Sequence, residues 1–354
     1  MKSPALRSGG VSYAVAAAVL FGVSTPVAKA ILRSVPPQLL AGILYLGSGV
    51  GLAIVSLIRR RVGLKSEAAL TRHDVPWLGS AILFGGILGP VLLLVGLTRT
   101  PAASASLLLN LEGVFTALIA WIVFRENVDR RIALGMLVIV VGGGVLSWEG
   151  HAEFGGVLGP PAIAAACACW AIDNNLTQKV SGGDPIQIAM LKGLFAGSVN
   201  VAIAMALGSS WPSAPRTGAA MVLGFLSYGV SLTLFVLALR HLGTARTGAY
   251  FSLAPFVGAA IALVWLRERP TVAFAVGAAC MAVGVWLHLT EHHEHQHVHE
   301  EMEHTHAHVH DEHHRHEHSP DDPPGEPHSH PHRHERLAHS HPHYPDIHHR
   351  HSHD

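Results

Sequence analysis

The sequence predicts an all-α integral membrane protein with ten transmembrane helices, arranged as two inverted five-helix repeats and followed by a disordered His-rich tail. Three observations predict this fold class. Hydrophobic residues make up 49% of the chain and charged residues 14%, against the roughly 25% charged residues of a typical soluble domain. The polar residues gather at one end, because 14 of the 24 acids and 24 of the 28 histidines follow Thr290. The preceding residues contain recurring apolar stretches of the length that a bilayer requires.

Each apolar stretch is bounded by charges or by Pro/Gly clusters and is about 20 residues long, enough for one helix to cross the hydrocarbon core. In residues 1–150 the expected spans are 11–32, 37–58, 75–97, 101–124 and 130–148. In residues 151–290 they are 155–177, 184–206, 217–239, 243–266 and 270–289. The first span is too long for a signal-peptide core and has a counterpart in the second half, so we expect it to be retained.

The two halves share an internal repeat. Residues 110–126 align with residues 252–268, and both segments run from a polar residue through an apolar stretch to an Arg-Glu pair. Because each repeat has an odd number of helices, the two copies must insert with opposite orientation. Secondary transporters with such inverted repeats bind their substrates near the bilayer midplane, between the repeats.

Lys and Arg residues are divided unequally between the two ends of the predicted spans. Thirteen lie on the side of the N-terminus and five on the other side. Positively charged residues accumulate on the cytoplasmic side of a membrane, so we expect a cytoplasmic N-terminus. With an even number of spans the C-terminal tail is cytoplasmic too, in a multi-pass protein of the cell (inner) membrane.

These features resemble the EamA-type transporters of the drug/metabolite transporter superfamily, over essentially all of residues 11–289. The family's fourth-helix pattern is divided between the two copies: Leu111-Glu112-Gly113 has the acid without the proline, and Ala254-Pro255-Phe256 has the proline without the acid. Glu126 and Glu268 match the closing Glu of that pattern. Lys29 matches a basic residue common at the end of the first helix, and Lys192 one common in the second helix of a unit. The resemblance implies ten helices and membrane transport of small molecules, usually efflux.

Polar residues at membrane depth are the candidate substrate or coupling site: Glu112, Asp173, Asn174, Asn175, Lys192, Lys29 and Asn110. An unpaired charge at the bilayer centre costs about 2.5–3.5 kcal/mol, so such residues are rare unless they pair or face a cavity. We expect Glu112, near the middle of its span, to bind a proton or a cationic substrate group, while Lys192 and Asp173 position the substrate's polar end. Two alternatives stay open: Lys29 extends to the interface, and Asp173 with Lys192 forms a structural ion pair.

Two local patterns indicate how the helices bend and pack. Pro26 lies inside the first span and has no backbone donor, so it is expected to kink that helix. The pairs Gly47/Gly51 and Gly85/Gly89 have the small-xxx-small spacing that lets membrane helices approach closely. Neither pattern indicates a substrate.

Residues 291–354 form the His-rich tail, with few apolar residues and histidine at alternate positions. Such a segment buries too little surface to fold alone and is expected to be disordered. Neutral imidazole binds zinc, nickel, cobalt and copper, so the candidate metal ligands are His304, His306, His308, His310, His328, His330 and His332. The alternatives are a purification tag, a pH-responsive polycation and metal buffering without a link to transport.

The sequence therefore predicts a secondary transporter, of the efflux type, for a small polar metabolite or for a transition metal or metal chelate. The alternative is a membrane-bound metal-binding sensor or buffer that transports nothing. An enzyme is disfavoured because the sequence has no nucleophile elbow, phosphate loop or zinc-protease helix. We expect no required cofactor, with Zn, Ni, Co or Cu bound by the tail. The expected partners are the lipid bilayer and the substrate, and no nucleic acid; a homodimer stays open.

Overall fold

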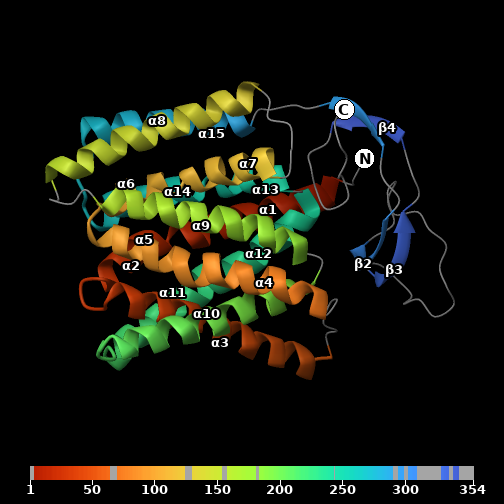
Figure 1. Cartoon of the computed structure of the whole chain (residues 1–354), viewed down its shortest axis with the longest axis horizontal. Coiled ribbons are helices and arrows are strands. Elements are labelled where there is room, and N and C mark those ends of the chain that lie inside the picture. Colours follow the sequence, from red (N-terminus) through yellow and green to blue (C-terminus); the bar gives the residue numbers. More distant parts are fainter. Residues whose placement is uncertain are drawn as a thin grey trace.

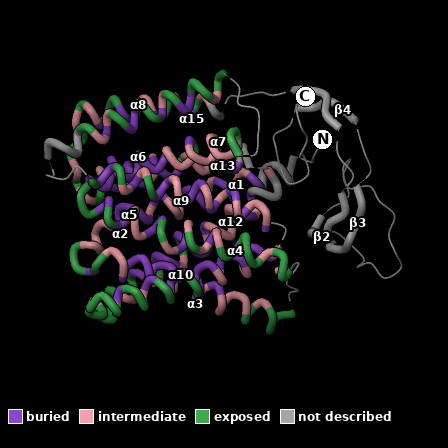
Figure 2. Tube along the Cα trace, viewed as in Figure 1, coloured by how far each residue is buried: buried purple, intermediate pink, exposed green. Residues whose placement is uncertain are grey.

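The computed structural model describes residues 4–63, 70–123, 130–153, 158–180, 183–242 and 244–289, together with four short strands in the tail. Between residues 4 and 289 the described chain is helical, and the helices lie side by side in a layered bundle (Figure 1). Exposed residues lie along its outside and buried residues between its layers (Figure 2).

The first half contributes the following elements, in chain order: α1 (Pro4–Gly22), α2 (Ser24–Ile31), α3 (Pro37–Arg61), the 3-10 turn η1 (Arg72–Asp74), α4 (Val75–Ala81), the π-helical segment η2 (Ile82–Leu88), α5 (Gly89–Thr98), α6 (Ala102–Leu108), α7 (Leu111–Val123) and α8 (Arg130–Glu153). The second half contributes α9 (Gly159–Val180), α10 (Pro185–Ala206), α11 (Ala214–Gly224), the π-helical segment η3 (Phe225–Val230), α12 (Ser231–Leu242), α13 (Thr244–Phe251), α14 (Ala254–Trp265) and α15 (Val272–Leu289).

Seven helical segments of the described chain are long and apolar enough to cross a membrane: Gly10–Ile31, Pro37–Arg61, Arg72–Thr98, Ala102–Val123, Arg130–Trp148, Pro185–Ala206 and Ala214–Ala238. Two shorter apolar helices cover Ala254–Trp265 and Val272–Leu287. The predicted sixth span, 155–177, overlaps α9, which has 22 residues and carries Asp173 and Lys179. Described helices, several of them broken, overlap each of the ten predicted ranges, and seven segments qualify as spans.

Three of the predicted spans are broken into two helices. The first span breaks at Val23, because Pro26 cannot donate to the carbonyl of Gly22, four residues before it; α1 ends and α2 begins at the place where we expected the proline to act. Pro255 acts in the same way on Phe251, the last residue of α13. The matching break between α6 and α7 has no proline. There the Asn110 side chain donates to the Leu107 carbonyl at 3.0 Å and competes with the helical backbone.

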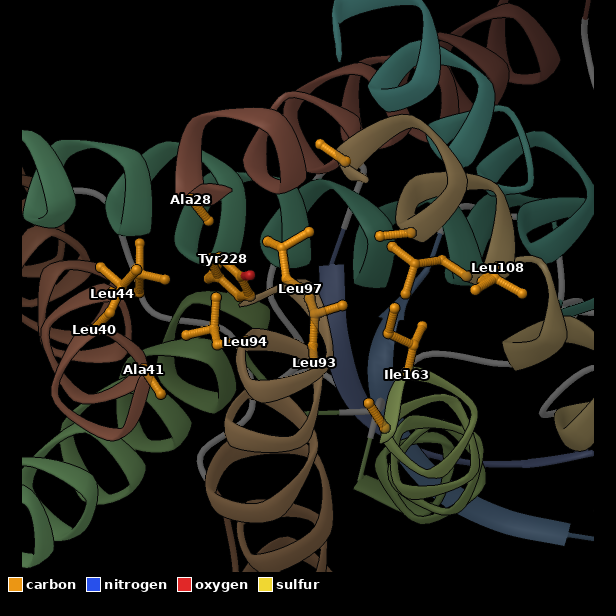
Figure 3. Close-up of a cluster of buried hydrophobic side chains, with 14 of the residues drawn as sticks. Ala28, Leu40, Ala41, Leu44, Leu93, Leu94, Leu97, Leu108, Ile163 and Tyr228 are labelled. Atoms are coloured by element: carbon orange, nitrogen blue, oxygen red, sulfur yellow. The ribbon is translucent and has the colours of Figure 1, made fainter. Parts of the chain in front are cut away.

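The two halves pack most closely where α3 meets α10, and η2 and η3 lie beside this seam. A Cβ at Gly47 would overlap the backbone of Met221 in α11, and one at Gly51 would overlap the Phe225 ring in η3. The close helix approach predicted from this glycine pair is therefore confirmed. The largest group of buried apolar side chains comes from both halves, with Leu40, Leu44, Leu93, Leu94, Leu97, Leu108, Ile163 and Tyr228 among its members (Figure 3).

The tail contains four strands where we expected none: β1 (Glu294–Val298), β2 (Met302–His308), β3 (His328–His334) and β4 (Ala338–Pro342). β1 pairs antiparallel with β4, and β2 with β3, as two separate two-stranded sheets. The prediction of disorder therefore differs from the structure in these segments. Alternating histidine has the two-residue period of a strand, although a two-stranded sheet by itself is marginal in water. The rest of the tail lies outside the described residues.

Candidate functional site

Glu112 lies at the break in the fourth span of the first half. It is the second residue of α7, and α7 packs against α9, which brings Asn174 opposite it. The amide nitrogen Nδ2 of Asn174 donates to Oε1 of Glu112 at 2.7 Å, and both side chains are half-buried. A carboxylate acceptor makes this a charge-assisted hydrogen bond. The partner of Glu112 is therefore a neutral group from the other half.

Asp173, next to Asn174 in α9, makes a second contact in a different direction. Successive residues of a helix are about 100° apart, so Asp173 points away from α7 and meets Lys192 of α10. The ammonium nitrogen Nζ lies 2.6 and 2.8 Å from the two carboxylate oxygens. Thr177, one turn further along α9, donates to Asp173 Oδ1 at 2.9 Å and accepts from Lys192 at 3.2 Å. All three side chains are buried, so this is a fully satisfied ion pair.

The first half approaches Asp173 through Gly85, in the π-helical segment η2. A Cβ at Gly85 would overlap the Asp173 carboxylate, so only glycine fits at this position without a shift. Because Pro90 has no N–H, it cannot donate to the carbonyl of Gly86, four residues before it. Tyr45 Oη donates to the Gly85 carbonyl at 2.7 Å and Trp170 Nε1 donates to it at 3.0 Å. Asn200 Nδ2, from α10, donates to the Gly86 carbonyl at 3.1 Å.

Sequence reasoning missed these carbonyls and the side chains that bind them, Tyr45, Trp170, Thr177 and Asn200. Pro90 could have indicated a free carbonyl, because a proline inside a span leaves the carbonyl four residues earlier without its helical donor. Which side chains fill that position depends on contacts between the halves, which a sequence pattern does not give.

Aromatic rings from both halves meet beside this network. Phe21 of α1 lies 6.0 Å from Trp170, 5.8 Å from Tyr228 and 5.4 Å from Phe251, measured between ring centroids. Tyr45 lies 5.3 Å from Tyr228. The rings meet edge-on or tilted, the geometries that aromatic pairs favour. Aromatic surface therefore adjoins the polar groups of α9.

The other predicted site residues have different partners. Lys29 donates to the carbonyls of Leu97 and Thr100, at 2.5 and 2.8 Å. Asn175 donates to the Ala171 carbonyl of its own helix at 2.8 Å. Asn110 contacts Leu107 and, at 3.7 Å, the sulfur of Met281, and its Oδ1 has no hydrogen-bond partner among the described residues. The structure thus brings Glu112 to Asn174 and Asp173 to Lys192, and it keeps the other three residues on separate contacts.

The predicted metal ligands of the tail take the following places. In the register of β2 and β3, His304, His306 and His308 lie opposite His332, His330 and His328. His310 lies outside the described residues. Within the part of the chain that the structure describes, no group of three or more His, Cys, Asp or Glu side chains is arranged to hold a metal ion.

Both halves of the chain are similar to known transporters. Residues 8–148 and 157–290 each match the EamA-like transporter family. An "Uncharacterized transporter" of Methanothermobacter thermautotrophicus is 29% identical over 300 residues, which cover 79% of this chain and 86% of that protein. The "Probable terminal-alkyne amino-acid exporter" of Streptantibioticus cattleyicolor is 26% identical over 219 residues, 61% of this chain and 73% of the exporter. One solved crystal structure superposes with a TM-score of 0.60 at 20% identity, covering 80% of this chain and 98% of that one, and it shares the fold.

Proposed function

We propose that this chain, which belongs to the EamA-like transporter family and is a multi-pass membrane protein, is a secondary transporter that exports a small polar metabolite carrying a positively charged amino group. The observation that carries this proposal is the Glu112 carboxylate, hydrogen-bonded by the neutral amide of Asn174. Glu112 is the group that we propose to bind the substrate's ammonium group or, when the substrate is absent, a proton.

The charge balance around α9 supports a cationic ligand. Asp173 and Lys192 neutralise each other in a buried, bidentate contact. Glu112 adds one further negative charge, and among the described residues no cationic side chain is paired with it. Such a charge at membrane depth costs about 2.5–3.5 kcal/mol, which a bound cation or proton offsets. Exchange between the two ligands at one carboxylate would couple substrate export to proton entry.

The similarity to a protein named as an amino-acid exporter supports the same substrate class, because an amino acid carries an ammonium group. The aromatic rings around Phe21 offer an apolar surface close to α9 for the rest of such a molecule. We therefore favour an amine with a short apolar or weakly polar body over a sugar or an anion.

The proposal includes ten membrane spans: the seven long apolar segments and three more, formed by α9, α14 and α15. It also includes cytoplasmic N- and C-termini in the cell (inner) membrane, because thirteen Lys and Arg residues lie at one end of the spans and five at the other. On this assignment the end of the bundle that holds Arg61 is cytoplasmic and the end that holds Arg99 is outside.

The test is thermal stabilisation of the purified protein by a panel of amino acids, amino sugars and small amines, each paired with its N-acetylated form. A ligand at 100 times its Kd stabilises the folded state by about 2.7 kcal/mol. We expect stabilisation by at least one amine and none by its acetylated form. The effect should be lost in Glu112→Gln and kept in the control Asp74→Asn, whose carboxylate lies in η1 outside α7 and α9. Equal stabilisation of wild type and Glu112→Gln would refute the proposal.

A transition metal or metal chelate is the second candidate substrate, and the His-rich tail favours it. Three histidines of β2 lie opposite three of β3 in the strand register, and imidazole binds Zn, Ni, Co and Cu. Deleting residues 291–354 should then change tolerance to these metals and the metal content of cells. If deletion changes metal binding by the protein but neither tolerance nor flux, the tail is a sensor or buffer; if tolerance and content do not change even when the whole gene is lost, this candidate fails.

A further inference from the structure

The two broken fourth spans of the repeats are packed together at one end only. α6 and α14, which occupy the half of these spans nearer Arg99, lie along each other (Figure 1). A Cβ at Gly258 of α14 would lie 2.7 Å from the Ser106 hydroxyl of α6, so the two helices are in direct contact. Among the described residues, α7 and α13, the other halves of the same spans, are not packed along each other in this way. The spans therefore converge at the Arg99 end.

Charged side chains hold this convergence at the Arg99 end. Glu268, just beyond α14 in the second half, accepts hydrogen bonds from the backbone nitrogens of Ala102 and Ala103, each at 2.8 Å. These are the first two residues of α6 in the first half, so one carboxylate joins the repeats. Lys29 of α2 donates to the carbonyls of Leu97, in α5, and of Thr100, in the turn before α6; these two hydrogen bonds lie within the first half, beside the end of α6 that Glu268 contacts. We call these four hydrogen bonds the closing contact.

The backbone next to Glu268 indicates that its position is held by the contacts it makes. Arg267 has φ = 54°, in the left-handed region, and it is the only non-glycine residue of the described chain with a positive φ. A side chain with a Cβ is unfavourable in this conformation, and such residues persist where surrounding contacts hold them. Two N–H donors on one carboxylate are contacts of that kind.

We propose that the closing contact is the gate at the Arg99 end of the transport pathway, with Glu268 and Lys29 as its positioning residues. Substrate leaves when the closing contact opens and α6 separates from α14. The described conformation is the one closed at the Arg99 end. This inference rests on the proposed transport function, and it gives Lys29 a gating role in place of contact with substrate.

The test is the rate at which a maleimide modifies Ser106→Cys, in full-length protein in nanodiscs whose three native cysteines are replaced by alanine. Ser106 is 1% exposed, one turn inside Ala102 on α6, so its modification requires α6 and α14 to separate. Nanodiscs give the reagent access to both faces, which makes the result independent of orientation. We expect Glu268→Gln and Lys29→Met each to raise the rate at least tenfold.

Two controls separate opening of the gate from loosening of the whole protein. A second reporter, Ser48→Cys, is also 1% exposed but lies in α3 beside η3, and its rate should not change in Glu268→Gln. Glu126→Gln removes the matching Glu of the other repeat and should not raise the rate at Ser106→Cys. Unchanged labelling at Ser106→Cys in both gate variants, or an equal rise at both reporters, would overturn the proposal.

Failure of the gate and failure of the proposed function give different results. Labelling needs no substrate, so a rise confined to Ser106→Cys supports the gate even if no amine is transported. Conversely, amine flux that depends on Glu112 while Ser106→Cys labelling stays unchanged in the gate variants would leave the transport proposal standing and refute this gate.

Discussion

Replacing Lys192 by methionine would leave the buried Asp173 carboxylate with Thr177 as its remaining side-chain donor. At the observed 2.6 Å separation, the Coulomb attraction of the pair is about 6 kcal/mol at an effective dielectric constant near 20. Desolvation of two ions, several kcal/mol each, offsets most of this. The intact pair is therefore close to neutral in net stability, whereas either residue alone retains its desolvation cost.

From this balance we expect Lys192→Met and Asp173→Asn each to lower the free energy of unfolding by about 3–5 kcal/mol. The double variant should lie within about 1 kcal/mol of wild type, because both charges are gone and Thr177 can still donate to the asparagine. The assay is reversible SDS unfolding in mixed micelles. The matched control is Arg59→Met, which removes the partner of Asp184 at 3.7 Å. It should cost no more than about 1 kcal/mol, because Asp184 keeps its hydrogen bonds from the backbone of α10.

Single variants within 1 kcal/mol of wild type would refute this reasoning, and so would a double variant whose loss equals the sum of the two single losses. The stable double variant then distinguishes the two roles left open by the sequence. Transport by that variant would assign Asp173 and Lys192 to structure alone, whereas loss of transport with retained stability would assign them to substrate positioning.

Three further predictions concern other contacts. Gly85→Ala should lower the free energy of unfolding by about 1–3 kcal/mol, because the added methyl overlaps the Asp173 carboxylate. The control Gly79→Ala, in α4 with open space around it, should stay within about 1 kcal/mol of wild type. Equal free energies for the two variants in chemical unfolding would contradict the close approach of η2 to α9. Trp170→Phe removes one of the two donors to the Gly85 carbonyl and should cost about 0.6–1 kcal/mol, typical of a hydrogen bond between membrane helices, so a loss above 3 kcal/mol would assign Trp170 a larger packing role. Isothermal titration should show that wild type binds Zn²⁺ or Ni²⁺ and that protein lacking residues 291–354 does not; retained binding would place the metal site elsewhere.

The positions of the helices could be predicted from the sequence because they depend on local composition. An apolar stretch of about 20 residues has one low-energy arrangement in a bilayer, and Pro26 and Pro255 determine helix breaks through a missing N–H. The break at Asn110 was not predicted, because an asparagine in a span does not by itself show that its side chain will bond to its own backbone. The π-helical segments depend on side chains from other helices that bind their free carbonyls.

The sequence could indicate which residues are candidates for the site, but not which neighbour each of their side chains faces. In the run Asp173-Asn174-Asn175 each side chain has a different partner: Lys192, Glu112 and the helix's own backbone. Three consecutive polar residues do not show which side of α9 faces which helix, because the neighbours of α9 come from both halves of the chain. Lys29 was a candidate because it is a charged residue inside a predicted span. Its hydrogen-bond partners, carbonyls of α5 and of the turn after it, could not be read from the sequence. The broken symmetry of the repeats was visible in the sequence, since Glu112 aligns with Ala254.

On the proposed mechanism, Glu112 exchanges a proton for a cationic amine. The most direct measurement is amine flux in proteoliposomes driven by an imposed pH gradient, with proton movement recorded by a trapped pH-sensitive dye. We predict that wild type couples amine movement to opposite proton movement and that Glu112→Gln, folded as judged by size-exclusion chromatography, shows neither. Wild-type flux with unchanged proton coupling in Glu112→Gln would refute this role of Glu112.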